Sequence, residues 1–436
     1  MRRRGITLPG AITVLCLASG VMAGTFYWDG PADKDWTALD NGGLSWWRVN
    51  SMSGAFSPTL PGDDDVCYIT KTTHVKTTVD LGNPGHYAVI HVGNGGSWGW
   101  YENAGNNPVV VEAGGTADFG NSSGSYSWFG SITLNGDLRL YKPEHYRDSW
   151  LQQTCKVSGP GKLICLNRGD LFIENYKNDY AGGTEIHGYE SFYDGVNFGN
   201  DNPAASGGAD GVFGTGPVDI FPHGLVEYNN SSHFTNDITS FYGCVGTNRI
   251  RGVGNRRWVL KGSNVVWRPG PRDNSGVGVR EVADMTELGA APDDGGGYPT
   301  LLIGIMPGGT NDMLSFVDNG SGAYADFKPD GNLMLVLTNV ATDAGHSDWK
   351  TQLDTKYTVA DLVGSAAQHT VTGRFANVHE PVAGMSYERI RFGGQFDWAY
   401  ITYEGESGSG ALSGGNDVLL WSVTPRPPEA TLLRIQ

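Results

Sequence analysis

Three consecutive carboxylates, Asp63, Asp64 and Asp65, have the residue type that binds a hard cation such as Ca²⁺, which takes several oxygen ligands. Successive side chains of a strand point to alternate faces, so at most two of the three converge on one ion. A solvated turn is the alternative. These aspartates are the candidate metal ligands of the chain, and Ca²⁺ is the one cofactor that the sequence suggests.

A second cluster gathers acid, base and cation within five residues, at Glu144, His145, Arg147 and Asp148. A lyase or a glycosidase uses such groups for proton transfer. Paired carboxylates must face each other across a groove, which spacing along the chain does not establish, and a solvated loop is the alternative. The sequence has no H-E-x-x-H zinc motif. We therefore assign no catalytic residue, and the sequence favours a protein without catalytic activity.

The first 23 residues have the pattern of a secretory signal peptide. Three arginines at 2–4 precede a mainly apolar run from Ile6 to Ala18, and Val21 and Ala23 stand where signal peptidase reads. The apolar run is shorter than the roughly 20 residues of a membrane span, although an uncleaved anchor remains the alternative. The sequence predicts a secreted or cell-surface protein whose mature chain has no membrane span.

Four cysteines remain after residue 23, at Cys67, Cys155, Cys165 and Cys244. An even number in an exported chain permits two disulfides. Cys155 and Cys165 lie on either side of a predicted turn at 159–161, so we expect them to be bridged or adjacent. The alternative is four buried thiols that pack as small hydrophobic groups.

The charge of the chain excludes some partners. The 30 Lys+Arg and 46 Asp+Glu give a net charge of −16, and without residues 1–23 the 27 basic and 46 acidic residues give −19. Nucleic acids and anionic membranes attract basic patches, so neither is expected as a partner. Polysaccharides or other surface proteins are the expected partners.

Composition and pattern predict an all-β fold. Glycine accounts for 65 of 436 residues, about twice its usual share of ~7%, and charged residues are only 17%. Short alternating runs such as 108–112, 162–166 and 218–221 are typical of half-buried strands joined by tight turns. Only 284–288 and 357–367 favour a turn or two of helix. A parallel solenoid and a β-sandwich are the two architectures left.

Four segments between 158 and 243 follow the order and spacing of a known repeat. They are G-P-G-K-L at 159–163, G-D-L-F-I at 169–173, N-D-Y-A-G-G-T-E-I at 178–186 and G-V-F-G-T-G-P-V at 211–218. Together they resemble one copy of the autotransporter-associated β-strand repeat. The resemblance implies a right-handed parallel β-helix that is secreted or at the cell surface, usually without assigned chemistry.

Both ends extend this resemblance. Y-W-D-G at 27–30, Trp46-Trp47 and P-G-D-D at 61–64 are similar to the opening of such exported proteins. Residues 401–405 and 415–420 are similar to the closing strand pair.

These patterns divide the chain into five parts: a signal peptide (1–23), an N-terminal aromatic cap (24–60), a β-solenoid (61–340), a C-terminal β region (341–424) and a tail (425–436). In the cap, Trp28, Trp46 and Trp47 either close the first coil or offer a platform for sugars. In the solenoid, six residues should point into one core: Leu163, Leu171, Ile173, Ile186, Val218 and Val226. Lys162, Asp170 and Glu227 should point to solvent.

The sequence thus favours a structural or adhesive protein of a cell surface or extracellular matrix. A polysaccharide lyase or hydrolase, and a carbohydrate-binding module, are the alternatives, and they rest on analogy with other parallel β-helices.

We predict cleavage after Ala23, because the basic residues, the apolar run and Ala23 together satisfy the signal-peptide pattern. N-terminal sequencing of the exported protein should give Gly24 as the first residue. A mature chain that begins with Met1 would contradict the prediction.

Overall fold

The computed structural model describes residues 23–426, except 32–33, 41, 71–73, 78, 94–96, 101–103, 115, 121–125, 143–148, 153, 168–170, 176, 188–193, 199–212, 222–223, 229–239, 244–245, 264, 319–324, 341–353 and 364–369. Residues 1–22, the cluster at 144–148 and Cys244 therefore lie outside the described part. Within the described residues the protein is all-β and contains no helix, as the composition predicts.

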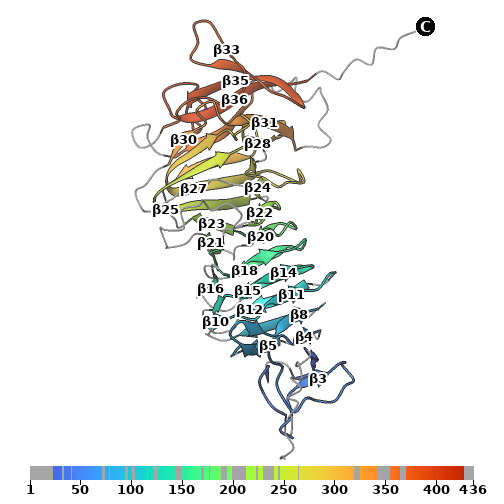
Figure 1. Ribbon diagram of the computed structural model, residues 1–436. Coiled ribbons are helices and arrows are strands. Elements are labelled where there is room, and N and C mark those ends of the chain that lie inside the picture. The colour runs from blue at the N-terminus through green and yellow to red at the C-terminus, as the bar shows by residue number, and fades with distance from the viewer. Residues whose placement is uncertain are drawn as a thin grey trace, which may run out of the picture.

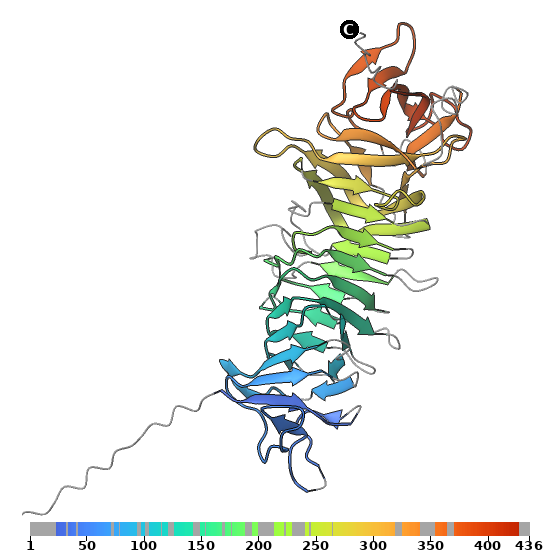
Figure 2. The ribbon, with the colours of Figure 1, turned by 90° about the vertical axis from the view of Figure 1, so that its right-hand side faces the viewer.

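Three large sheets, parallel over most of their strands, form the body of the molecule (Figures 1 and 2). The seven-stranded sheet has the order β17 (Val157–Ser158), β14 (Ile132–Leu134), β11 (Val109–Val111), β8 (Val89–Val92), β4 (Val66–Ile69), β1 (Thr25–Trp28) and β3 (Trp47–Val49). The twelve-stranded sheet has the order β2 (Lys34–Asp35), β5 (His74–Thr77), β9 (Ser97–Trp100), β12 (Thr116–Gly120), β15 (Asp137–Lys142), β18 (Leu163–Asn167), β20 (Thr184–Ile186), β22 (Val218–Ile220), β24 (Ser240–Gly243), β26 (Val266–Arg268), β28 (Thr300–Ile305) and β31 (Met334–Asn339).

The fifteen-stranded sheet has the order β10 (Ala104–Gly105), β13 (Tyr126–Trp128), β16 (Ser149–Leu151), β19 (Leu171–Ile173), β21 (Asp194–Phe198), β23 (Gly224–Tyr228), β25 (Gly246–Lys261), β27 (Gly278–Ala291), β29 (Met313–Val317), β32 (Lys356–Leu362), β36 (Asp417–Pro425), β35 (Phe396–Gly405), β34 (Glu388–Arg391) and β33 (His379–Pro381), with β30 (Asp326–Lys328) beside β27. A short hairpin joins β6 (Gly82–Asn83) to β7 (His86–Tyr87).

The chain visits the three sheets in turn. From β11 to β19 it passes from the seven-stranded to the twelve-stranded to the fifteen-stranded sheet, three times over. Every strand pair described between 158 and 243 is parallel, which is the strand direction expected of a parallel solenoid. A sandwich would have placed mainly antiparallel neighbours there.

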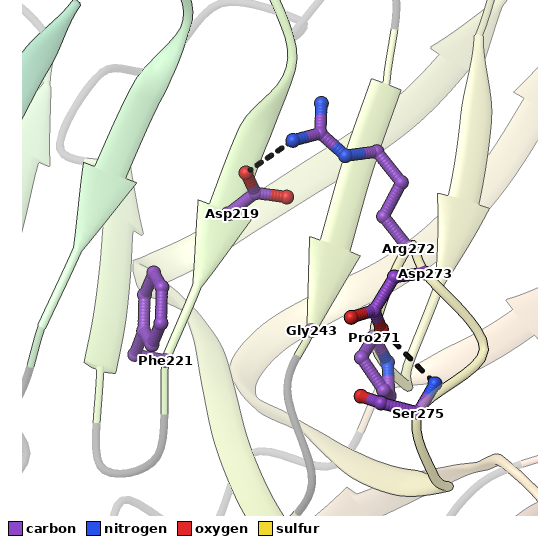
Figure 3. Close-up of a pocket in the computed structure, with 7 residues that line it drawn as sticks. All are labelled: Asp219, Phe221, Gly243, Pro271, Arg272, Asp273 and Ser275. Carbon is purple, nitrogen blue, oxygen red and sulfur yellow. Dashed lines mark hydrogen bonds and ion pairs between the residues drawn. The ribbon is translucent and has the colours of Figure 1, made fainter.

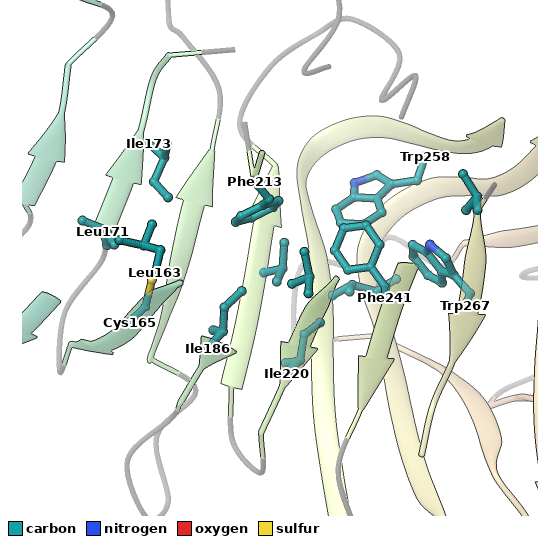
Figure 4. Close-up of a cluster of buried hydrophobic side chains, with 14 of the residues drawn as sticks. Leu163, Cys165, Leu171, Ile173, Ile186, Phe213, Ile220, Phe241, Trp258 and Trp267 are labelled. Carbon is teal, nitrogen blue, oxygen red and sulfur yellow. The ribbon is translucent and has the colours of Figure 1, made fainter. Parts of the chain in front are cut away.

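In-register pairing stacks apolar side chains in columns. In the seven-stranded sheet one buried column consists of Phe26, Cys67, Ile90, Val109, Ile132 and Val157. Figure 4 shows the corresponding buried side chains of the other two sheets, which meet between the strands. All six residues predicted for the core are at most 1% exposed. Lys162 is half-buried at the surface, while Asp170 and the side chain of Glu227 lie outside the described residues.

The repeat-like segment at 178–184 has a physical role in this stacking. Tyr180 is fully buried, and its hydroxyl lies 2.6 Å from Thr184 Oγ1. Asn178 Oδ1 accepts a hydrogen bond from Val157 N at 2.8 Å. Gly183 has φ +95°, a backbone conformation that other residues rarely adopt. Thr215 N donates to Tyr180 O at 2.9 Å, so the next turn stacks directly on this one.

The N-terminal end is closed by aromatic residues. β3 pairs antiparallel with β1 at the edge of the seven-stranded sheet. Trp28, Trp36 and Trp47 are buried there, and Trp47 Nε1 donates to Trp36 O at 2.8 Å. Because Trp28 and Trp47 are buried, their faces are not offered to a sugar. Trp46 is only partly buried.

The C-terminal end changes to antiparallel pairing. β36 pairs antiparallel with both β32 and β35, and β35 with β34. The helix prediction was wrong for the described residues of both stretches, since 284–288 lies in β27 and 357–362 lies in β32. Each of these strands has hydrogen-bonded neighbours on both sides, and this pairing outweighs local helix preference.

Val111→Ala should lower the free energy of unfolding by roughly 2–3 kcal/mol, because two buried methyl groups are lost and a cavity is left. Val111 is 1% exposed. Val110→Ala is the matched control, since the adjacent valine points the other way and is only half-buried; its effect should stay below about 1 kcal/mol. Chemical denaturation measures both variants, and equal losses would contradict the inward and outward assignment.

Candidate functional site

Polar side chains gather on the outer face of the twelve-stranded sheet. Glu185 of β20, Asp219 of β22 and Tyr242 of β24 occupy the same register position on three adjacent strands. Buried residues flank each of them along its strand, so all three side chains point outward. Parallel pairing spaces such neighbours about 4.8 Å apart, and the two carboxylates therefore act on each other.

Glu185 lies between two basic side chains. Its Oε1 is 2.5 Å from Lys162 Nζ, and its Oε2 is 3.2 Å from His187 Nε2. The hydrogen bond from His187 is the largest cause that lowers the pKa of Glu185 to about 2, and Lys162 acts in the same direction. Glu185 is therefore held as a carboxylate. The ring of His187 stacks on Phe221, with 3.9 Å between the centroids.

Asp219 lines an open depression of about 400 Å³ (Figure 3). The other lining residues are Phe221, Gly243, Pro271, Arg272, Asp273 and Ser275. Asp219 Oδ2 lies 3.2 Å from a guanidinium nitrogen of Arg272, whose Cζ is 5.6 Å from the centre of the Tyr242 ring. On the far side of the depression, Ser275 N donates to Asp273 Oδ1 at 3.0 Å.

The electrostatic environments of the two neighbouring carboxylates differ. Burial raises the pKa of Asp219, with Arg272 opposing the shift and Glu185 adding to it, whereas the pKa of Glu185 is lowered. Two carboxyl groups whose pKa values move apart are the arrangement that separates a proton donor from a base. The same groups, with Arg272, also offer both acceptors and donors to a hydroxyl-rich ligand.

A buried ion pair holds the loop that forms the wall of the depression. Arg268 Nε donates to Asp312 Oδ2 at 2.9 Å, and the two side chains are 1% and 0% exposed. The guanidinium also donates to Asn274 Oδ1 within the loop. Asp312 accepts further hydrogen bonds from Gly278 N at 2.8 Å and from Gly304 N at 2.7 Å. Burial raises the pKa of Asp312 in spite of Arg268.

Backbone contacts fix the start of the same loop. Gly243 N donates to Gly270 O at 3.1 Å, and Asn248 Nδ2 donates to Pro269 O at 3.1 Å. A Cβ atom on Gly243 would lie 1.8 Å from Pro269 O, so only glycine permits this close approach. The loop is thus attached to the sheet at both ends by buried polar groups.

The three predicted metal ligands do not converge. Asp63 Oδ1 accepts hydrogen bonds from Asn83, Asp64 lies 3.3 Å from His86 Nδ1, and Asp65 accepts hydrogen bonds from Gly24 N and Gly62 N. Each carboxylate thus has separate partners in a turn. Among the described residues, no group of three or more His, Cys, Asp or Glu side chains is placed to hold a metal ion.

The structure does not contain the predicted Cys155–Cys165 bridge. Cys67, Cys155 and Cys165 are free and buried. Cys155 precedes β17 of the seven-stranded sheet, whereas Cys165 lies in β18 of the twelve-stranded sheet. Burial raises the pKa of all three thiols, so they pack as hydrophobic groups, which was the alternative for these cysteines.

Sequence reasoning missed Glu185 and Asp219. The signal was the shared pattern of T-E-I-H at 184–187 and V-D-I-F at 218–221, in which an acid stands between two core residues and a ring follows. Superposing these two short strands would have placed one acid beside the other. The thirty residues between the two segments hide that relation from a reading along the chain.

Glu185→Gln should lower the free energy of unfolding at pH 7 by about 1.5–3 kcal/mol, the usual range for hydrogen bonds to a charged group. The pKa of Glu185 in the folded protein is about 2, below the ordinary value of 4.5. Its stabilising effect is therefore complete above about pH 5 and is lost as the pH falls through about 2.

Denaturation of the wild-type protein and of Glu185→Gln between pH 7 and pH 2 measures the difference between their free energies of unfolding, which should become smaller as the pH falls. Glu112→Gln is the control, because that carboxylate also contacts a histidine, His91, but is 41% exposed, and solvent screening should make its effect smaller. A difference in the free energy of unfolding between the wild-type protein and Glu185→Gln that does not change with pH would contradict the lowered pKa of Glu185.

Comparisons with known proteins found no relative of this chain. No protein-family model, curated protein or solved structure matches it. No helix in the described part of the chain is long and apolar enough to cross a membrane.

Proposed function

We propose that this chain is an exported structural or adhesive protein of a cell surface or extracellular matrix, built as a right-handed parallel β-helix. The observation that carries the proposal is the parallel stacking of strands around one apolar core, in three sheets as far as β17 and in two of them from β18 to β31. The signal-peptide pattern and the resemblance to the autotransporter-associated repeat support export and surface location.

The architecture suits this task because each strand inside a sheet is hydrogen-bonded to a neighbour on both sides. Stacked units of this kind give a long scaffold whose outer faces repeat along one axis. The sheets extend from the aromatic N-terminal end to the antiparallel C-terminal end (Figure 2). Such a scaffold presents side chains at fixed intervals to a polysaccharide or to other surface proteins, which are the partners we propose.

A polysaccharide lyase or hydrolase is the second candidate. It is favoured by one observation, the opposite pKa shifts of Asp219 and Glu185 on neighbouring strands beside an open depression. A raised pKa suits a group that donates a proton, and a lowered pKa suits a group that stays ionised. The enzyme candidate requires catalytic turnover of a polysaccharide, whereas the structural or adhesive candidate does not.

Expression of the full chain with its own N-terminus should place the protein in the medium or on the cell surface, and fractionation with an antibody measures this. The purified protein should release no reducing ends from polysaccharides. Retention of the whole protein in the cytoplasm would contradict the first candidate. Release of reducing ends that falls at least about 100-fold in both Asp219→Asn and Glu185→Gln would establish the enzyme instead.

A further inference from the structure

We propose that the depression at Asp219 is a binding site for a neutral saccharide chain that lies along the outer face of the twelve-stranded sheet. The proposal names the ligand class of the adhesive function and rests on that function. It concerns the site formed by β20, β22, β24 and the loop at 269–278.

The groups in the depression match the chemistry of a sugar. A sugar ring has hydroxyl groups that donate and accept hydrogen bonds, and it has apolar C–H faces. Asp219 and Asp273 supply acceptors, and Arg272 supplies donors beside them (Figure 3). The rings of Phe221 and Tyr242 supply apolar surface next to these polar groups. A few placed polar groups with aromatic neighbours are typical of a small-ligand site.

The site continues along the sheet, which favours a chain over a single sugar. Asp219 is followed in register by Glu185, and the Phe221 ring is followed by the stacked ring of His187. Lys162, which directly precedes β18, reaches Glu185 from the next position along the sheet. Polar and aromatic groups therefore recur at the strand spacing of about 4.8 Å, so a linear ligand meets similar partners at successive positions.

The charges of the site favour a neutral ligand. Each cation is already paired, Lys162 with Glu185 and Arg272 with Asp219. Asp273 adds a carboxylate whose pKa is lowered by hydrogen bonds from Ser275. The chain as a whole has a net charge of −16. The negative electrostatic potential of these carboxylates would repel a uronic acid polymer, whereas it would not repel a neutral glycan.

The wall of the site is held in place before any ligand arrives. The buried Arg268–Asp312 pair and the hydrogen bond from Gly243 to Gly270 attach the loop to the sheet. A loop that is already ordered loses little conformational entropy on binding, and this raises affinity. Asp312 and Arg268 are in this sense positioning residues, since both lie beneath the surface and line no part of the depression.

The test measures binding of the purified full chain to immobilised glucan, mannan, galactan and xylan, with polygalacturonate as the anionic comparison. At least one neutral polymer should bind, and polygalacturonate should not. Asp219→Asn and Arg272→Ala should each weaken that binding about 10-fold to 100-fold, which corresponds to one lost hydrogen bond to a charged group.

The controls come from a second surface ion pair, Lys156 with Asp179, whose Nζ and Oδ2 atoms are 2.6 Å apart. Asp179→Asn and Lys156→Ala remove matching charges outside the depression and should leave binding unchanged. Arg272 is half exposed, so Arg272→Ala is expected to fold, and circular dichroism checks every variant.

Three outcomes would overturn the proposal: no neutral polymer binds, polygalacturonate binds more tightly than every neutral polymer, or the control variants weaken binding as much as the site variants. None of these outcomes bears on export, which fractionation measures separately, so the failure of this proposal and the failure of the proposed function remain distinguishable.

Discussion

In-register parallel pairing is the constraint on which the rest of this structure depends. A strand has a side-chain period of two, so a slip of one residue would turn each inward side chain to solvent. The column from Phe26 through Ile90 and Val109 to Val157 exists only because each strand stands directly over the last. The same register brings Glu185 beside Asp219 on the outer face. Core and candidate site therefore follow from one geometric rule.

Stacked sheets of this type need special treatment at their ends, because an open edge offers unpaired backbone groups to other chains. At the N-terminal end, β3 pairs antiparallel with β1, and the paired residues Trp28 and Trp47 are both buried. At the other end, the antiparallel strands around β36 follow the last parallel pairing of β32 with β29. Asp417 belongs to this closure, since it is 4% exposed and accepts hydrogen bonds from Leu362 N and Ser407 N.

Features carried by local pattern could be predicted from the sequence. The inward positions of Leu163, Ile186 and Val218 follow from alternation within single strands, and the turn at 178–184 follows from its own residues. Helix was wrongly favoured at 357–362, because pairing with β29 and β36 decides that segment. The prediction of a Cys155–Cys165 bridge was wrong for a related reason. The two residues are near in sequence, but Cys155 precedes a strand of the seven-stranded sheet, whereas Cys165 lies in a strand of the twelve-stranded sheet.

The candidate site could not be predicted because it depends on which strands become neighbours. The residues at 184–187 do not indicate that the strand at 218–221 will pair with them. The length of the loop between the two strands does not determine the register of that pairing either. The loop at 269–278 adds a second long-range dependence, since Asp312 holds it from 34 residues beyond Gly278. Outward positions also carry weak sequence signals, because solvent accepts almost any polar residue there.

The two kinds of ion pair at the site differ in what they contribute. A partly exposed pair such as Arg272–Asp219 contributes about 0–1 kcal/mol. Removal of one partner from a buried pair costs about 3–5 kcal/mol, because the remaining charge is left without compensation. Replacement of a whole buried pair by apolar residues is often neutral or stabilising, so stability alone does not account for Arg268 and Asp312. Apolar residues at these positions would fill the same space, but they would not hold Asn274, Gly278 and Gly304 by hydrogen bonds. What the charges add is a defined conformation of the 269–278 loop, and this conformation sets the shape of the depression beside Asp219.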